Sequence, residues 1–180
     1  MTNPIVVVEY DAHWPVAFVT IRATLETALV GVPVIGIEHV GSTSVPGLAA
    51  KPIIDIDVIV DRSHVGDATA ALEAVGYRSL GELGVPNRYA FKTPPDSIRQ
   101  NTYVIVDGCL SLRNHVGLRD VLRGDPELRD EYSSVKRQLA ATTDDIDVYV
   151  DGKTDVVRRV LARAGLADRE LDEIEAGNRL

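Results

Sequence analysis

Hydrophobic residues recur along this chain with two different periods, and the period separates predicted helices from predicted strands. Phe18, Ile21, Leu25 and Leu29 follow the three-to-four-residue spacing of one helix face, which predicts a helix at 14–30. Shorter Ile- and Val-rich runs bounded by Gly, Pro and Asn predict strands. The predicted strands are 34–40, 52–60, 77–80, 89–92 and 101–106, and the further predicted helices are 65–75, 110–122, 126–141 and 154–164.

The order of these elements indicates an α/β fold with a mixed sheet flanked by helices. Loops rather than helices separate the strands at 77–80, 89–92 and 101–106, so a strictly parallel sheet is not expected. We expect one domain over residues 1–180, in which helices at about 110–166 form a C-terminal helical part. Residues 168–180 carry several charges and few large apolar groups, which predicts a loosely held tail.

Two aspartates interrupt the apolar strand predicted at 52–60. Asp55 and Asp57 share one face, because side chains alternate along a strand. Two neighbouring carboxylates on a mostly buried strand repel each other and are costly to desolvate. A hard divalent cation such as Mg²⁺ compensates for both effects, so we interpret both aspartates as metal ligands and catalytic residues. The alternative is a strand edge with two solvated carboxylates.

A Gly-Ser turn precedes the aspartate strand. Gly41 lets the backbone approach a ligand closely, and Ser42, Thr43 and Ser44 offer hydroxyls and amides. Such a turn can hold phosphate oxygens, although many Gly-Ser pairs are plain loops. His39, just before the turn, either contacts the phosphate or braces the turn by a hydrogen bond.

The motifs together resemble a known family. The stretch EHVGSTSVPGLAAKPIIDIDV at 38–58 resembles the signature of the GrpB family of bacterial proteins, also called UPF0157. The opening VEYDAHWPVAF, the pair Arg99 and Asn101, the segment RDVLRGDPELRDEYSSVKRQLA and the closing VLARAG are similar to other parts of that family. The likeness covers about residues 7–166. A Gly-Ser turn followed by Asp-x-Asp in an apolar strand is also similar to the wider nucleotidyltransferase superfamily.

The resemblance implies a nucleotidyltransferase-like fold, with Mg²⁺ as cofactor and a nucleoside triphosphate as substrate. This chain departs from the family at one position, since Tyr103 stands where we expect a histidine. Superfamily enzymes often place a third carboxylate on a comparable strand. None occurs within 101–106, and Asp107 lies just past its end. A protonated phenol is a poor ligand for Mg²⁺, which weakens the case for catalysis.

Six basic residues are candidates for contacts with the nucleotide, although each can also be a solvated or ion-paired surface side chain. They are Lys51, Arg88, Lys92, Arg99, Lys136 and Lys153. The three from 88 to 99 could form a positive wall opposite the aspartates. The last two belong to the C-terminal helical part, which in folds of this kind often closes over the nucleotide.

The charge and composition limit the classes of partner. A net charge of −8 argues against non-specific binding to nucleic acid. A single cysteine excludes a disulfide framework and a cysteine-based zinc site. No N-terminal signal pattern occurs, and no apolar run reaches the ~18 residues of a membrane span, so we expect a cytoplasmic protein. The oligomeric state stays open.

Three functions fit these observations. The first is metal-dependent transfer of a nucleoside monophosphate from a triphosphate to a small-molecule or protein acceptor. The second is a nucleotide-binding or partner-binding module of the same fold that has no turnover. The third is an adaptor for another protein, for which the resemblance suggests a link to coenzyme A metabolism.

Overall fold

A five-stranded mixed sheet forms the centre of the computed structural model, which describes residues 4–177. The strands are β1 (Val34–Val40), β2 (Ile54–Val60), β3 (Arg78–Gly81), β4 (Arg88–Lys92) and β5 (Gln100–Val106). Their order in the sheet is β1-β2-β5-β4-β3, and β2 and β5 are parallel while the other neighbours are antiparallel. The expected α/β class with a mixed sheet is therefore confirmed.

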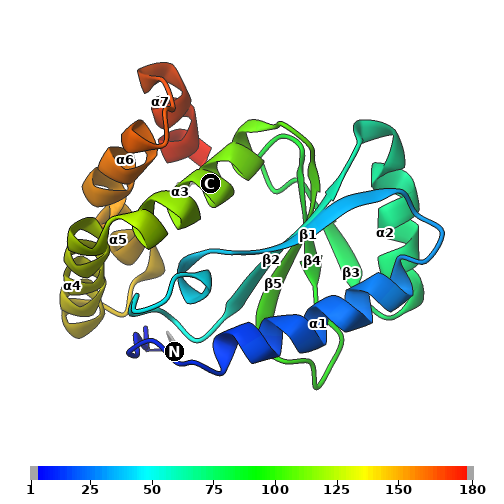
Figure 1. The fold of residues 1–180 in the computed structure, drawn as a ribbon, viewed down its shortest axis with the longest axis horizontal. Helices are drawn as coiled ribbons and strands as arrows, with labels where there is room; N and C mark the ends of the chain where they lie inside the picture. The colour runs from blue at the N-terminus through cyan, green and yellow to red at the C-terminus, as the bar shows by residue number, and fades with distance from the viewer. Residues whose placement is uncertain (1–3, 178–180) are drawn as a thin grey trace.

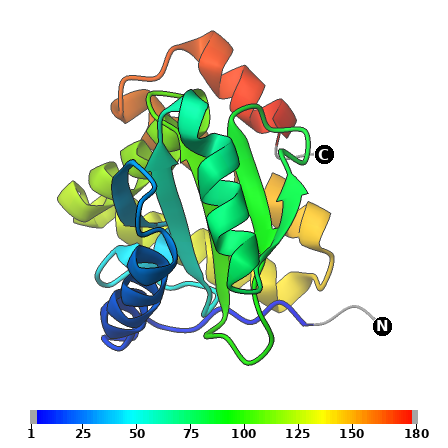
Figure 2. The ribbon, with the colours of Figure 1, turned by 90° about the vertical axis from the view of Figure 1, so that its right-hand side faces the viewer.

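Helices cover both faces of this sheet (Figure 1). Two of them, α1 (Trp14–Ala28) and α2 (Val65–Ala74), lie on one face, as the rotated view in Figure 2 shows. The helix α3 (Leu110–Gly124) covers the opposite face, and the remaining helices gather beside it. These are α4 (Pro126–Thr142), α5 (Ile146–Asp151), α6 (Thr154–Arg163) and α7 (Asp168–Gly177), with short 3₁₀ turns η1 (Ser42–Ser44) and η2 (Arg62–His64) after β1 and β2. The predicted C-terminal helical part is thus present.

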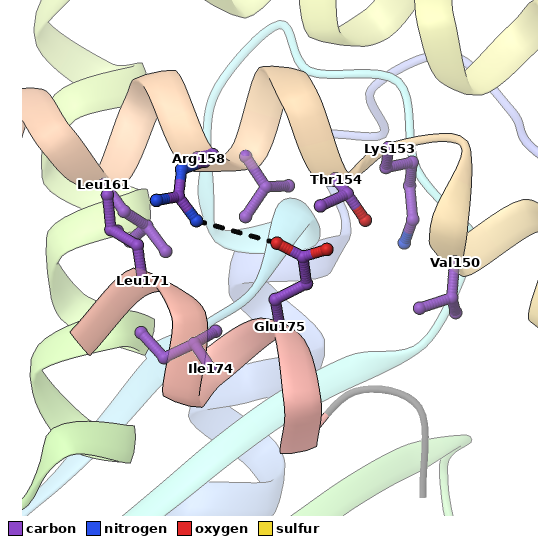
Figure 3. Close-up of a pocket in the computed structure, with 9 residues that line it drawn as sticks. Val150, Lys153, Thr154, Arg158, Leu161, Leu171, Ile174 and Glu175 are labelled. Atoms are coloured by element: carbon purple, nitrogen blue, oxygen red, sulfur yellow. Dashed lines mark ion pairs between the residues drawn. The ribbon is translucent and has the colours of Figure 1, made fainter. Parts of the chain in front are cut away.

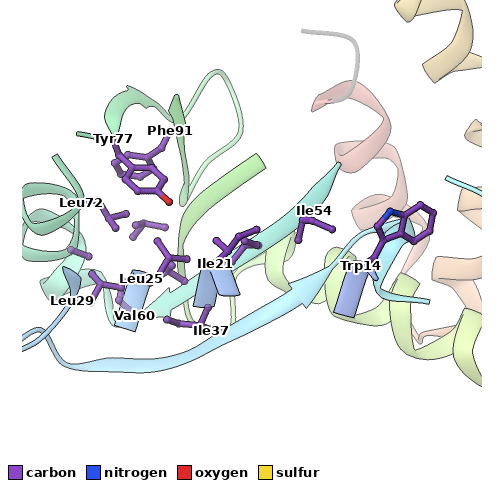
Figure 4. Close-up of a cluster of buried hydrophobic side chains, with 14 of the residues drawn as sticks. Trp14, Ile21, Leu25, Leu29, Ile37, Ile54, Val60, Leu72, Tyr77 and Phe91 are labelled. Atoms are coloured by element: carbon purple, nitrogen blue, oxygen red, sulfur yellow. The ribbon is translucent and has the colours of Figure 1, made fainter. Parts of the chain in front are cut away.

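The main core lies between the sheet and the pair α1 and α2 (Figure 4). Ile21, Leu25 and Leu29 of α1 pack there, as their helical spacing predicts. The even-numbered residues of β2, among them Ile56 and Val58, point into the same core. Because side chains alternate along a strand, Asp55 and Asp57 are directed to the other face, towards α3.

The prediction of a loosely held C-terminal tail is wrong for residues 168–177, which form α7. Leu171 is 4% exposed and packs with Leu161 and Leu166. Arg158 of α6 pairs with Asp172 of α7 at 2.7 Å, and Figure 3 shows its ion pair with Glu175 across a small cavity of about 150 Å³. A charged segment can still form a helix when one apolar stripe finds a partner, and composition alone does not reveal that stripe. Residues 178–180 lie outside the described part.

None of the helices between residues 4 and 177 is long and apolar enough to cross a membrane.

Candidate functional site

A cavity of about 250 Å³ lies where the end of β1 and the start of β2 meet α4 and α5. We call it the lysine cavity. Its lining combines the Gly-Ser turn, one aspartate, three lysines and two tyrosines. The lining residues are Gly41, Ser42, Thr43, Lys51, Ile53, Asp55, Asn101, Leu118, Tyr132, Lys136, Tyr149 and Lys153.

The Gly-Ser turn is held rigidly against the aspartate strand. Gly41 has φ +68°, and a Cβ atom at this position would lie 2.1 Å from Asp55 Oδ2, so only glycine fits. Thr43 Oγ1 donates to Ile53 O at 3.1 Å and contacts His39 Nε2 at 3.0 Å. Ser44 Oγ donates to Gly41 O at 2.6 Å, and its side chain does not line the cavity. The hydroxyl of Ser44 is therefore occupied within the turn.

The contacts of His39 favour the bracing role over the phosphate-binding one. Its ring stacks on Phe18 at 4.8 Å and meets the hydroxyl of Thr43. Burial, together with the positive charges of Arg123 and Arg119, lowers the pKa of His39 to about 4. A neutral imidazole enclosed in this way supports the turn and carries no charge for an anion.

The two aspartates share a face but not the same exposure to solvent. Asp55 lines the cavity and accepts a hydrogen bond from Asn101 Nδ2 at 2.7 Å. Asp57 is 0% exposed and does not line the cavity, although it shares the face of Asp55 as predicted. His115 of α3 closes over it, with Nδ1 at 2.8 Å from Asp57 Oδ2. Within the described chain, Asp57 Oδ1 is buried and has no hydrogen-bond partner.

Electrostatics couples the two carboxylates with the histidine above them. Burial raises the pKa of Asp55, and the nearby charge of Asp57 adds to this effect, whereas Asn101 and His115 oppose it. Burial alone would lower the pKa of His115, but the carboxylates of Asp57 and Asp55 raise it above its usual value. The histidine therefore interacts electrostatically with both carboxylates and most directly with Asp57.

Three lysines from distant parts of the chain direct their amino groups into the cavity. Lys136 of α4 is 2% exposed, and its Nζ donates to Ser42 Oγ at 3.0 Å. Burial lowers its pKa to about 6, with a further contribution from the charges of Lys153 and Arg137. Burial and the charge of Lys51 lower the pKa of Lys153 to about 8, and burial also lowers the pKa of Lys51.

Aromatic rings lie beside the amino groups of all three lysines. Lys136 Nζ lies 4.4 Å from the ring centroid of Tyr132. Lys51 and Lys153 approach the ring of Tyr149 at 5.5 Å and 4.6 Å. Three lysines therefore face one carboxylate in a small space, and none of the ion pairs among residues 4–177 involves them.

The other predicted basic residues do not line this cavity. Arg88 lies on the aspartate face, but its guanidinium is 5.0 Å from the ring of Tyr103 and lines a different cavity. Lys92 is exposed opposite Arg78, and Arg99 is exposed on the loop before β5. The predicted positive wall of Arg88, Lys92 and Arg99 is therefore not part of the lysine cavity. Strand register, which the sequence does not specify, sets how far each strand residue lies from Asp55.

Several residues of the site were missed by sequence reasoning. Asn101 pairs with Asp55 in the β2–β5 register, and Tyr103 pairs with Asp57. The only feature of the sequence that could have pointed to His115 is its position on an amphipathic helix. Asp107, the suggested substitute for a third carboxylate, is exposed at the opposite end of β5. The described residues contain no cluster of three or more His, Cys, Asp or Glu side chains arranged for a metal ion.

Comparison with known proteins places these features in a family. Residues 4–163 match the family described as GrpB protein. A UPF0157 protein of Streptomyces coelicolor is 39% identical over 165 residues, which cover 89% of this chain and 84% of that protein. A protein of Mycolicibacterium paratuberculosis named dephospho-CoA kinase is 31% identical, over 89% of this chain and 46% of its own length.

A solved structure supports the same assignment. The crystal structure of the conserved protein GrpB from Enterococcus faecalis has a TM-score of 0.76 and 31% identity, over 89% of this chain and 100% of that chain. The chain therefore belongs to the GrpB family.

Proposed function

We propose that the lysine cavity binds the phosphates of a nucleoside triphosphate and that the site transfers the nucleoside monophosphate to an acceptor. The observation that carries the proposal is the convergence of Lys51, Lys136 and Lys153 beside Asp55. A buried lysine whose pKa is strongly lowered is costly to the fold, and such residues cluster at functional sites. An anion with several charges would restore their protonated state.

The aspartate pair fits a magnesium ion. Its donors are carboxylate oxygens, and the buried Asp57 Oδ1 lacks any partner in the described chain. Mg²⁺ is commonly held by one or two carboxylates, with water and phosphate oxygens completing its shell. Bound there, the ion would neutralise phosphate charge and polarise the α-phosphate.

The residues of the cavity have separate tasks in the proposed transfer. An acceptor hydroxyl or amine attacks the α-phosphorus, and the bond to the β-phosphate oxygen breaks, so that pyrophosphate leaves. The acceptor proton passes to a carboxylate of the aspartate pair. Lys136 and Lys153 stabilise the charge that develops on pyrophosphate, and the hydroxyl of Ser42 orients one phosphate oxygen.

Calorimetric titration of the four nucleoside triphosphates, with and without Mg²⁺, tests binding. We expect one or more to bind with Mg²⁺, and Lys136→Met to weaken binding at least tenfold. Arg137→Met, a change at an exposed neighbour on α4, is the matched control. Equal affinities for both variants would refute the site. Pyrophosphate release in the presence of cell-extract metabolites then tests transfer.

A binding module without turnover is the second candidate. Tyr103 supports it, because this residue stands beside Asp57 in the register and burial raises the pKa of its phenol to about 12. A Tyr103→Asp variant would add a third carboxylate, and we expect it to bind Mg²⁺ more tightly than wild type in a metal titration. The coenzyme A hypothesis rests on the relative named dephospho-CoA kinase and stays a proposal. Dephospho-coenzyme A belongs in the same titrations.

A further inference from the structure

A second and larger cavity, of about 390 Å³, opens on the same face of the sheet as the aspartates. We call it the Arg88 cavity. It lies between the loop that joins β3 to β4, the first turns of α3, and α7. Val85, Pro86, Leu110 and Ile174 give it apolar walls, while Arg88, Ser111 and Asn114 are polar groups in the lining. This size and mixture suit a small organic molecule.

Arg88 is the unusual group in this cavity. Its Nε atom is buried and has no hydrogen-bond partner in the described chain. None of the ion pairs among residues 4–177 involves it. Glu173 also lines the cavity, but it is exposed, and water screens its charge. A guanidinium fork without a carboxylate matches a planar carboxylate or a phosphate from a ligand.

A short path of side chains joins the Arg88 cavity to the aspartate pair. The guanidinium of Arg88 lies 5.0 Å from the ring of Tyr103, and that ring lies 5.9 Å from the ring of His115. His115 in turn contacts Asp57 at 2.8 Å. The lysine cavity instead adjoins Asp55, at the start of β2. The two cavities thus approach the aspartate strand from two directions.

This arrangement suits an in-line transfer. The attacking group and the leaving pyrophosphate lie on opposite sides of the phosphorus in such a reaction. When the lysines hold the pyrophosphate end, the acceptor must approach from elsewhere. The nucleoside part of the triphosphate is uncharged and cannot form an ion pair with Arg88. An acceptor with an acidic group can form one.

The helix α7 supplies part of this cavity. Residues 168–177 lie beyond the segment 4–163 that matches the family, yet Ile174, Ala176 and Gly177 line the cavity. The wall that selects the ligand is therefore supplied in part by a segment outside the matched region.

We propose that the Arg88 cavity binds the acceptor, a small molecule in which an apolar body carries a carboxylate or phosphate group. Arg88 holds that oxyanion on the far side of Tyr103 and His115 from Asp57, and a hydroxyl or amine elsewhere on the same molecule is the attacking group. The acceptor role rests on the proposed function, but the anion site itself does not.

Phenylacetate and phenyl phosphate are suitable probes, since one carries a carboxylate and the other a phosphate on the same ring. Their binding is followed by NMR titration of the full chain. Arg88→Met removes the fork, and Ala176→Trp fills the cavity from an exposed position of α7. Arg78→Met, at an exposed arginine of β3, is the control. The affinity of each variant for the magnesium triphosphate is measured in parallel.

At least one probe should bind, and both cavity variants should weaken it about tenfold or more, while Arg78→Met stays within about twofold. Triphosphate affinity should be unchanged in Arg88→Met. Absence of probe binding, equal binding in Arg88→Met, or displacement of the probe by adenosine would overturn the proposal. Arg88-dependent probe binding without any triphosphate binding would instead overturn the proposed transferase and the acceptor role with it.

Discussion

Replacement of the buried Lys136 by methionine should stabilise the free protein while it removes the proposed ligand binding. At pH 7 the unfolded lysine, with its ordinary pKa of 10.5, is protonated, whereas the folded one, with a pKa of about 6, is mostly neutral. Folding therefore requires the lysine to lose its proton, which costs about 1.4 kcal/mol for each unit between pH 7 and its unfolded pKa. This cost of roughly 5 kcal/mol opposes folding. The methionine variant also loses the hydrogen bond to Ser42, which reduces its stability by about 1 kcal/mol. We therefore expect a net gain of about 2–4 kcal/mol in the free energy of unfolding.

The sign of the pH dependence distinguishes this cause from better packing. Between pH 6 and 10.5 the unfolded state binds more protons at this residue than the folded state, so wild-type stability rises with pH in that window. The methionine variant lacks this contribution, and its advantage should be largest near pH 6 and vanish near 10.5. Lys153, Arg137 and Asp55, whose charges also act on Lys136, remain in both proteins and cancel in the comparison to first order.

Urea unfolding at several pH values between 7 and 10 measures the effect. Arg137→Met is the control, because its guanidinium is 46% exposed and pairs with Glu9 at 2.8 Å, so its effect should stay within about 1 kcal/mol. Destabilisation by Lys136→Met at pH 7, or an advantage that does not change with pH, would show that the lysine is not held in a neutral form. The electrostatic basis of the lysine cavity would then be refuted.

Three further predictions, each tested by substitution and urea unfolding at pH 7, concern the site and the fold. Asp55→Asn should stabilise the metal-free protein by about 1 kcal/mol, because it removes a buried carboxylate whose pKa burial raises. Asp57→Asn should instead destabilise it, because the amide carries no charge to pair with His115. Equal effects of the two changes would contradict this assignment. Gly41→Ala should cost about 2–4 kcal/mol, since strain at positive φ adds to a clash with the carboxylate, and Gly31→Ala, with open space around it, should cost about 1 kcal/mol. Leu171→Ala should cost about 2–3 kcal/mol, and no measurable loss would indicate that α7 is not packed.

The sequence predicted the elements of the fold better than the assembly of the site. The strand β2 and the helix α1 were predicted within a few residues, and so was the common face of Asp55 and Asp57. Each of these follows from a period of two or 3.6 residues, which arises from local backbone sterics. The mixed direction of the strands followed from the lengths of their connections.

Only the tertiary structure decided which charged groups meet. Lys136 contacts Ser42 across 94 positions of sequence, and His115 reaches Asp57 across 58. Arg88, by contrast, joins the aspartate face but lies in another cavity. Local patterns fix the face on which a side chain lies, but helix packing and strand register fix its distance from a distant residue. The sequence by itself determined the aspartate strand and its glycine turn, and the packing of the C-terminal helices made them one wall of a cavity lined by three lysines.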